Sequence, residues 1–237
     1  MARLSGKKVV VIGGASGVGH AVGAAALAAG AEVVVGSSQA ARIAAAAERL
    51  GHGTVGRTVD VRDEASVAAF FDAVGTFDHL VFTAGDWGHM FGPTGTLDID
   101  ASKARLEVRF WGAARAAKHA LRHIVPAGSI TLTGGMLAHR PMPGAPLTTA
   151  SAQSTEGLAV GLARDLAPIR VNAVCLGLIL SEQVQGMGEA AIKGYTAHLP
   201  LPRPGTTAEA AEAYLYLMQA TYVTGQVVRV DGGASLV

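Results

Sequence analysis

The sequence has 237 residues, of which 50% are hydrophobic, 5% aromatic and 16% charged. This length suits one large domain with a substantial core, and the high apolar fraction excludes an intrinsically disordered chain. With 19 basic and 18 acidic residues the formal net charge is +1, so no global field draws the chain to nucleic acid or to an anionic membrane.

Short β-branched runs alternate with longer, alanine-rich segments of helical periodicity. The predicted strands are Lys8–Ile12, Glu32–Val35, Thr54–Val59, His79–Thr83, Ser129–Thr133, Arg170–Cys175 and Val227–Val230. The predicted helices are His20–Ala29, Ala40–Leu50, Glu64–Val74, a long one capped by Asp98 or Asp100 and running to about Ile124, then Thr148–Leu166 and Glu209–Met218. This alternation predicts an α/β fold: a doubly wound parallel sheet (Rossmann fold) in three α/β/α layers, formed by a single domain over residues 1–237.

The cysteine count and the hydropathy pattern limit the cellular compartments in which the protein is expected. The single cysteine, Cys175, excludes an intramolecular disulfide and a cluster of thiolates around a metal. The N-terminal apolar run stops at Gly13, too early for the apolar region of a secretory signal. No apolar stretch approaches the roughly 18 residues that a membrane-spanning helix needs. We therefore expect a cytoplasmic protein with no membrane partner.

A glycine-rich turn, residues 13–19, joins the first predicted strand to its helix. Glycines permit a tight turn and a close approach of the backbone to a pyrophosphate, and the helix N-terminus offers free N–H groups. The turn alone is compatible with a plain strand–helix connection, but its position favours nucleotide binding. The predicted phosphate-binding residues are Gly13, Ser16, Gly17, Val18 and Gly19.

The spacing Gly-x-x-x-Gly-x-Gly in this turn resembles that of the short-chain dehydrogenase/reductase family, with Ile12 in place of the family's threonine. The resemblance extends over nearly the whole chain, and Leu176 replaces a family proline before Gly177. It implies binding of a nicotinamide cofactor. The further positions that it assigns to the cofactor are Asp60, Val61, Ala84, Gly85, Ile179 and Ser181.

The end of the second predicted strand bears on the choice of cofactor. Members of this fold that prefer NAD carry an acid there, which holds the ribose hydroxyls and repels a 2′-phosphate. This chain has Ser37 and Ser38 instead, and Arg42 follows one turn later. Arg42 alone could equally be a solvated helix residue. Since the acid is missing, we expect NADP(H) in preference to NAD, with Ser37, Ser38 and Arg42 as cofactor-binding residues.

The positions where the family keeps its catalytic residues are changed. The family uses Asn, Ser, Tyr and Lys, and the resemblance places Arg109, Gly135, Thr148 and Ala152 at those four positions. The chain has no tyrosine before Tyr195 and no lysine between Lys118 and Lys193. The usual tyrosine acid and its lysine are therefore missing from the helix at Thr148 under any alignment.

Three other residues are candidates for the chemistry. Arg109 is expected to point into the pocket, where it could bind an anion or polarise a carbonyl, or form a structural ion pair. His139 has a pKa suited to proton transfer, or is an exposed loop residue. Tyr195 lies in a substrate lid expected over about 181–204, where it could donate a proton or simply pack. His89 is a weaker candidate of the same kind.

No metal site is expected. His119 and His123 share a helix face, but without a third ligand nearby they are interpreted as surface residues.

Three classes of function remain open. The first, which we favour, is an NADP(H)-binding oxidoreductase with a non-standard active site, acting on a small-molecule carbonyl, enone or alcohol. The second is a catalytically degenerate cofactor-binding sensor or regulator, which the four changed positions favour. The third is a non-redox cyclase or lyase that reuses the pocket. The resemblance also implies a homodimer or homotetramer built through two long helices.

Overall fold

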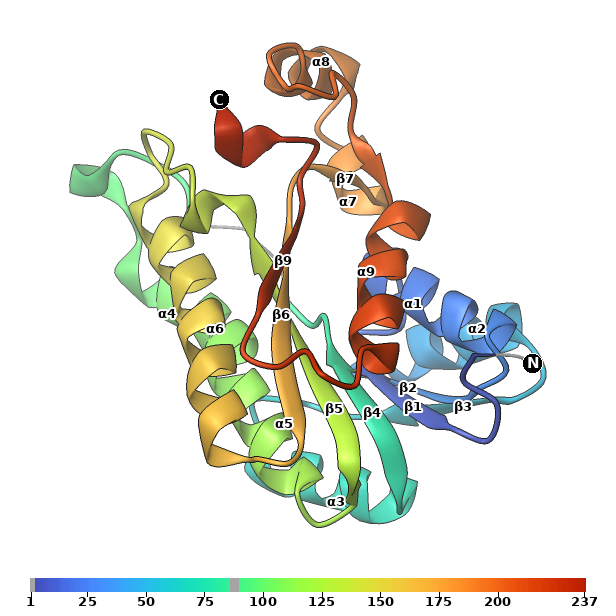
Figure 1. Ribbon diagram of the computed structural model, residues 1–237. Helices are drawn as coiled ribbons and strands as arrows, with labels where there is room; N and C mark the ends of the chain where they lie inside the picture. Colours follow the sequence, from blue (N-terminus) through green and yellow to red (C-terminus); the bar gives the residue numbers. More distant parts are fainter. Residues whose placement is uncertain (1–2, 86–89) are drawn as a thin grey trace.

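The computed structural model describes residues 3–85 and 90–237 (Figure 1). Its main sheet has seven parallel strands in the order β3-β2-β1-β4-β5-β6-β9. The strands are β1 Lys8–Ile12, β2 Glu32–Ser37, β3 Thr54–Thr58, β4 Phe77–Phe82, β5 Ile124–Gly135, β6 Arg170–Leu176 and β9 Val227–Val230. A separate two-stranded sheet pairs β7 Ile179–Leu180 with β8 Gly205–Thr206.

Helices cover both faces of the main sheet. The α-helices are α1 Gly17–Ala28, α2 Ala40–Leu50, α3 Glu64–Val74, α4 Ile99–Leu106, α5 Gly112–Ala120, α6 Pro146–Asp165, α7 Glu182–Gln185, α8 Glu189–Thr196 and α9 Thr207–Gln219. Short 3-10 turns lie at η1 Thr94–Thr96, η3 Met136–Ala138 and η4 Ala234–Leu236, and a π-helical turn at η2 Glu107–Trp111. Helices α1, α2 and α9 pack on one face, and α3, α5 and α6 on the other (Figure 1). The predicted doubly wound α/β fold is confirmed.

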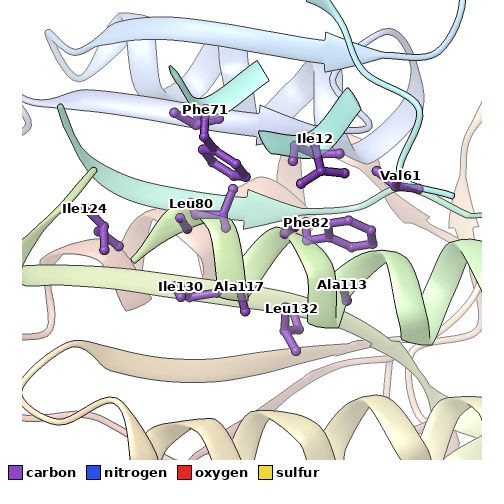
Figure 2. Packing of buried hydrophobic residues seen from close by; sticks show 14 of the residues in the cluster. Ile12, Val61, Phe71, Leu80, Phe82, Ala113, Ala117, Ile124, Ile130 and Leu132 are labelled. Atoms are coloured by element: carbon purple, nitrogen blue, oxygen red, sulfur yellow. The ribbon is translucent and has the colours of Figure 1, made fainter. Parts of the chain in front are cut away.

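Strand β1 shows why the sheet needs both layers. Val10 and Ile12 join the core on the α3–α5–α6 side, whereas Val9 and Val11 join the core on the α1–α2–α9 side. Successive side chains of a strand point to opposite faces, so a continuous apolar run fits a strand that is buried twice. Figure 2 shows Ile12 among the aromatic and aliphatic side chains of the first core, including Phe71. Full burial of such a side chain contributes about 1.5–3 kcal/mol.

The strand order reverses beside β1, which pairs with β2 on one side and β4 on the other. At such a switch point the connections from adjacent strands leave in opposite directions, which opens a crevice at the carboxyl ends of the strands. The glycine-rich turn between β1 and α1 lies at this point, so the topology places it at the crevice.

The helical segment predicted to run from Asp98 or Asp100 to about Ile124 is present as far as Ala120, but the predicted end is a few residues too late. It begins as predicted, since Asp98 caps α4 by accepting a hydrogen bond from the Ala101 N–H at 2.9 Å. The π-turn η2 then interrupts the α-helical pattern, α5 ends at Ala120, and Ile124 already belongs to β5. Ile124 pairs with Phe77 in β4, and a bulge follows before the regular pairing resumes at Ser129. Ile124 therefore belongs to a paired strand, although the helical periodicity of the sequence assigned it to the helix.

Smaller differences lie at helix starts and in the segment after β6. Helix α6 starts at Pro146, because proline suits the first turn of a helix. Helix α9 starts after Thr206, which forms a capping box with Glu209. The short elements β7, α7, α8 and β8 were not predicted. None of the helices within residues 3–85 and 90–237 is long and apolar enough to cross a membrane.

Candidate active site

A cleft of about 960 Å³ lies at the carboxyl ends of the central strands. It gathers side chains and backbone from the glycine-rich turn, from the ends of β2, β4, β5 and β6, and from η2. All residues predicted to bind the cofactor line it: Gly13, Ser16, Gly17, Val18, Gly19, Ser37, Ser38, Arg42, Asp60, Val61, Ala84, Gly85, Ile179 and Ser181. Residues far apart in the sequence thus form one continuous wall.

The glycine-rich turn is held in a shape that only glycine permits. Gly13 and Gly17 have φ angles of 97° and 55°, in the left-handed region. A Cβ on Gly19 would lie 2.3 Å from the Gly13 carbonyl oxygen, and one on Gly13 would lie 2.5 Å from Thr83 Oγ1. The first N–H groups of α1 have no partner within the helix, so the turn presents donors and the positive end of the helix dipole to the cleft. This cradle fits a pyrophosphate.

The wall at the end of β2 is uncharged apart from Arg42. Ser37 and Ser38 line the cleft there, and Arg42 lies in the first turn of α2 with its side chain exposed. Gln39, which the sequence analysis did not single out, completes this wall. The arrangement offers hydroxyl and guanidinium donors and no carboxylate.

Asp60 is paired with an arginine that the sequence analysis also missed. Arg62 Nη2 donates to Asp60 Oδ2 at 2.7 Å and Arg62 Nε donates to Oδ1 at 3.0 Å. The hydrogen bonds from Arg62 hold the pKa of Asp60 below its usual value. Both residues line the cleft, so this part of the wall carries a neutralised carboxylate. The sequence could have indicated this ion pair, because Arg62 follows Asp60 by only two positions.

Arg109 enters the cleft from the π-turn η2 and is buried, with 8% of its surface exposed. Its stem lies against Gly85, where a Cβ would be only 2.5 Å from Arg109 Cγ. Gly85 has φ 140°, a conformation that other residues rarely adopt. The glycine at the end of β4 therefore makes room for the arginine. Arg105, in α4, also lines the cleft and was not predicted.

The other three positions that the resemblance assigns to the family's catalytic residues are placed differently. Gly135 lines the cleft at the end of β5. Thr148 is fully buried in the first turn of α6 and donates its hydroxyl to the Met90 carbonyl at 2.8 Å. Ala152, one turn later, is also fully buried and does not line the cleft. The Thr148 hydroxyl is thus engaged with the backbone of the segment after β4.

His139 and Tyr195 lie outside the described lining of the cleft. His139 Nε2 is 3.0 Å from Glu156 Oε1, and Arg229 Nη2 donates to His139 Nδ1 at 3.1 Å. Tyr195, in α8, donates its hydroxyl to the Met136 sulfur at 2.9 Å, and burial raises the pKa of this phenol. Both side chains are therefore already engaged with protein groups.

His119 and His123 each pair with a carboxylate of α3. His119 Nε2 lies 3.1 Å from Glu64 Oε1, and His123 Nε2 lies 3.0 Å from Asp72 Oδ1. Each histidine thus faces a different carboxylate of α3 rather than a shared site. His89 falls outside the described residues.

Comparisons with known proteins agree with this architecture. The family model described as enoyl-(acyl carrier protein) reductase matches residues 13–235. The short-chain dehydrogenase/reductase ucsE of Acremonium sp is 34% identical over 261 residues, covering 98% of this chain and 96% of the relative. The structure of the MalC reductase/Diels-Alderase from Malbranchea aurantiaca superposes with a TM-score of 0.92 at 29% identity, covering 100% and 99% of the two chains. A small-chain dehydrogenase in complex with NADPH superposes with a TM-score of 0.81 at 33% identity, covering 98% and 99%.

The glycine-rich turn, the strand order and the full-length similarity thus lead to one assignment. This chain belongs to the short-chain dehydrogenase/reductase family.

Proposed function

We propose that this protein is an NADP(H)-dependent oxidoreductase with a non-standard active site, and that its substrate is an enone-like or quinone-like small molecule. The proposal has two parts, the cofactor and the acceptor, and each is supported by different residues of the cleft. A single observation carries the second part: the described lining of the cleft contains no tyrosine, lysine, histidine or cysteine.

The cradle at α1 supports a dinucleotide. Gly13, Gly17 and Gly19 leave the space and the N–H groups that a pyrophosphate needs. Ala84, Gly85, Ile179 and Ser181 line the part of the cleft beyond β4 and β6, where the nicotinamide half would lie. When bound, NADPH would supply a hydride at that end of the cleft. The similar dehydrogenase that contains NADPH supports the same choice.

The wall at the end of β2 supports NADP(H) over NAD(H). A 2′-phosphate would meet the hydroxyls of Ser37 and Ser38 and the guanidinium of Arg42, all of which can donate hydrogen bonds to it. An acid at this point would repel the phosphate, and the chain has none there.

The catalytic end of the cleft supports an acceptor that needs no strong protein acid. Reducing a simple ketone produces an alkoxide, which takes a proton from a positioned acid during catalysis. Arg109 retains its proton, so it cannot serve as that acid, but it can stabilise a negative oxygen by charge-assisted hydrogen bonds. Reducing an enone or a quinone places the charge on an enolate or phenolate oxygen, a far weaker base that can take its proton from water. Arg109 would stabilise this oxyanion.

A second candidate function is non-redox catalysis in the same pocket. It is supported by the similarity to the reductase/Diels-Alderase MalC, whose name couples reduction with a cyclisation. The four changed catalytic positions fit this candidate as well as they fit a cofactor-binding sensor. Turnover of NADPH distinguishes these candidates from the proposed reductase.

The experiment is a panel assay of NADPH oxidation with a simple ketone, an enone and a quinone. We expect turnover of the enone or quinone and little of the ketone. Tight NADPH binding without turnover of any class would contradict the reductase and favour the sensor. In the active enzyme, Arg109→Met should lower kcat with the enone or quinone while NADPH still binds, and Arg122→Met, an exposed arginine of the α5–β5 connection, serves as the matched control. An Arg109 variant with unchanged kcat would contradict the oxyanion role.

We also propose that residues 181–204 form a lid over the substrate and that the protein is a cytoplasmic homodimer or homotetramer. Ser181, at the start of this segment, lines the cleft. Helix α8, later in the same segment, projects from the body of the molecule at the top of Figure 1. Trp111 and Val160, next to or within the two long helical segments, are about half exposed, at 53% and 52%. Apolar groups of this size favour burial against another chain. Light scattering of the purified protein tests the oligomer, and a monomeric mass would exclude it.

A further inference from the structure

Three side chains with different donor atoms converge beside the carboxyl ends of β5 and β6, outside the described lining of the cleft. His139 follows η3, Glu156 lies in α6 and Cys175 lies in β6. One ligand atom of each lies within 4.8 Å of the other two. Imidazole nitrogen, carboxylate oxygen and thiolate sulfur are the ligand types that zinc takes in proteins. We propose that His139, Glu156 and Cys175 bind one Zn²⁺ ion.

The separations are close to those of a tetrahedral site. Zinc–ligand bonds of about 2.0–2.3 Å hold neighbouring ligand atoms about 3.3–3.7 Å apart. His139 Nε2 and Glu156 Oε1 are 3.0 Å apart, so this pair opens slightly when a metal enters. The widest separation, at most 4.8 Å, has to close by about 1 Å, and His139 lies in the connection between η3 and α6 rather than in a paired strand. A small shift of one loop side chain therefore completes the set.

The surroundings leave access for the metal and for a fourth ligand. Cys175 is fully buried, the Glu156 side chain is 13% exposed and the His139 side chain is 24% exposed. The site thus opens to solvent on the histidine side, where a water can complete the coordination. Gly134 in β5 faces Glu156, and even a Cβ there would approach Oε1 to 3.6 Å. The absence of a side chain at this position keeps the flank of the carboxylate clear.

The charges balance once the metal is bound. An ordinary cysteine thiol is neutral at pH 7, and Cys175 is fully buried beside Glu156. Zinc binding releases the thiol proton to solvent, as it does for zinc-bound cysteines in general. One carboxylate and one thiolate then offset the two positive charges of the ion, with the imidazole neutral. Asp231 also lies near the thiol and adds negative charge.

Arg229 competes with the metal in this arrangement. Its Nη2 donates to His139 Nδ1, which fixes the imidazole with its proton on Nε2, toward Glu156. Zinc on Nε2 requires that proton on Nδ1 instead, and Arg229 then has to turn away. The side chain is exposed, so it can do this at little cost. Removing Arg229 should therefore strengthen metal binding, a result that a purely structural ion-pair network would not give.

The test is a titration of the full-length protein with Co²⁺ under reducing conditions, followed by competition with Zn²⁺. Cobalt bound to a thiolate absorbs in the near ultraviolet through charge transfer from sulfur. Because the chain has a single cysteine, such a band can come only from Cys175. We expect one equivalent of Co²⁺ to produce the band and Zn²⁺ to abolish it.

The variants test the cysteine and histidine ligands and the competition with Arg229. Cys175→Ala and His139→Ala should each weaken Zn²⁺ binding by at least about a hundredfold, since even groups that only orient a ligand contribute up to about that factor. Arg229→Ala should bind more tightly than the parent protein. His123→Ala, which removes an imidazole paired with Asp72 on another part of the molecule, is the matched control and should bind as the parent does.

Either of two results would overturn the site: no charge-transfer band in the parent protein, or a Zn²⁺ affinity that His139→Ala leaves unchanged. Even if Cys175→Ala does not fold, the charge-transfer band of the parent protein shows whether Cys175 binds the metal as a thiolate. None of these readouts involves NADPH, so the outcome is independent of the proposed oxidoreductase activity.

Discussion

Substituting Arg42 by Ala tests the assignment of the cofactor directly. Arg42 lies in the first turn of α2, exposed at the wall of the cleft that Ser37 and Ser38 also form. If a 2′-phosphate lies against this wall, the guanidinium donates a charge-assisted hydrogen bond to it. NADH lacks that phosphate, so the substitution should distinguish the two cofactors.

The size of the effect follows from the exposure of the side chain. Hydrogen bonds to charged groups contribute about 1.5–3 kcal/mol, and solvent screening at an exposed position reduces this to about 1–2 kcal/mol. Since about 1.4 kcal/mol is a tenfold change in affinity, Arg42→Ala should weaken NADPH binding by about 5- to 30-fold. The affinity for NADH should stay within about twofold, because no contact to it is lost.

The assay is a fluorescence titration of each variant with NADPH and with NADH, repeated at low and high salt. The loss should shrink at high salt, because added ions screen the exposed guanidinium. Arg122→Ala removes an exposed arginine of the α5–β5 connection and should bind both cofactors as the parent does. Equal losses for NADPH and NADH in Arg42→Ala would refute the reasoning, since a phosphate-specific contact cannot affect NADH.

Three further substitutions test the cradle, the buried hydroxyl and the core histidine. Gly19→Ala should abolish NADPH binding in a fluorescence titration, because its Cβ would lie 2.3 Å from the Gly13 carbonyl oxygen; retained binding would contradict the cradle. Thr148→Val should lower the free energy of unfolding in urea by about 1–3 kcal/mol, since the buried Met90 carbonyl loses its donor, yet leave kcat nearly unchanged; a large loss of kcat would instead indicate a catalytic hydroxyl. Burial lowers the pKa of His79 from 6.5 to about 4, so between these values the unfolded chain binds a proton that the folded protein does not, and stability falls as the pH falls. Between pH 7 and pH 4.5, the free energy of unfolding in urea should fall less in His79→Asn than in the parent protein. Identical falls in the two proteins would show that His79 does not cause the pH dependence.

Much of the fold was readable because its signals are local. The β-branched runs identified all seven strands of the main sheet, and Asp98 marked the start of α4. The glycine-rich turn was equally clear, because the spacing of its glycines is visible in the sequence. One of the reasons for that spacing is not local, since a Cβ on Gly13 would lie 2.5 Å from Thr83 Oγ1, just after β4.

The errors arise where distant segments decide the outcome. Ile124 is compatible with a helix in its own neighbourhood, but pairing with Phe77 makes it part of β5. The sequence analysis did not predict the π-turn that carries Arg109 or the packing of the Arg109 stem against Gly85, which lies 24 positions earlier. His139 and Glu156 meet only because η3 and α6 approach each other in three dimensions. Sequence spacing carries no information about such contacts.

The two halves of the cleft depend on the fold in different ways, which explains how one can be kept while the other changes. The cradle works through its backbone, and a Cβ on Gly13 or Gly19 would come within 2.6 Å of neighbouring backbone atoms, so the fold itself opposes substitution there. The catalytic positions work through side-chain chemistry that the fold does not require. Ala152 packs with no exposed surface, and Thr148 turns its hydroxyl to the segment after β4 instead of to the cleft. In the proposed enzyme, losing the family's acid would therefore cost the scaffold little stability, and Arg109 would give the same cleft a different chemistry: stabilising an anion rather than donating a proton.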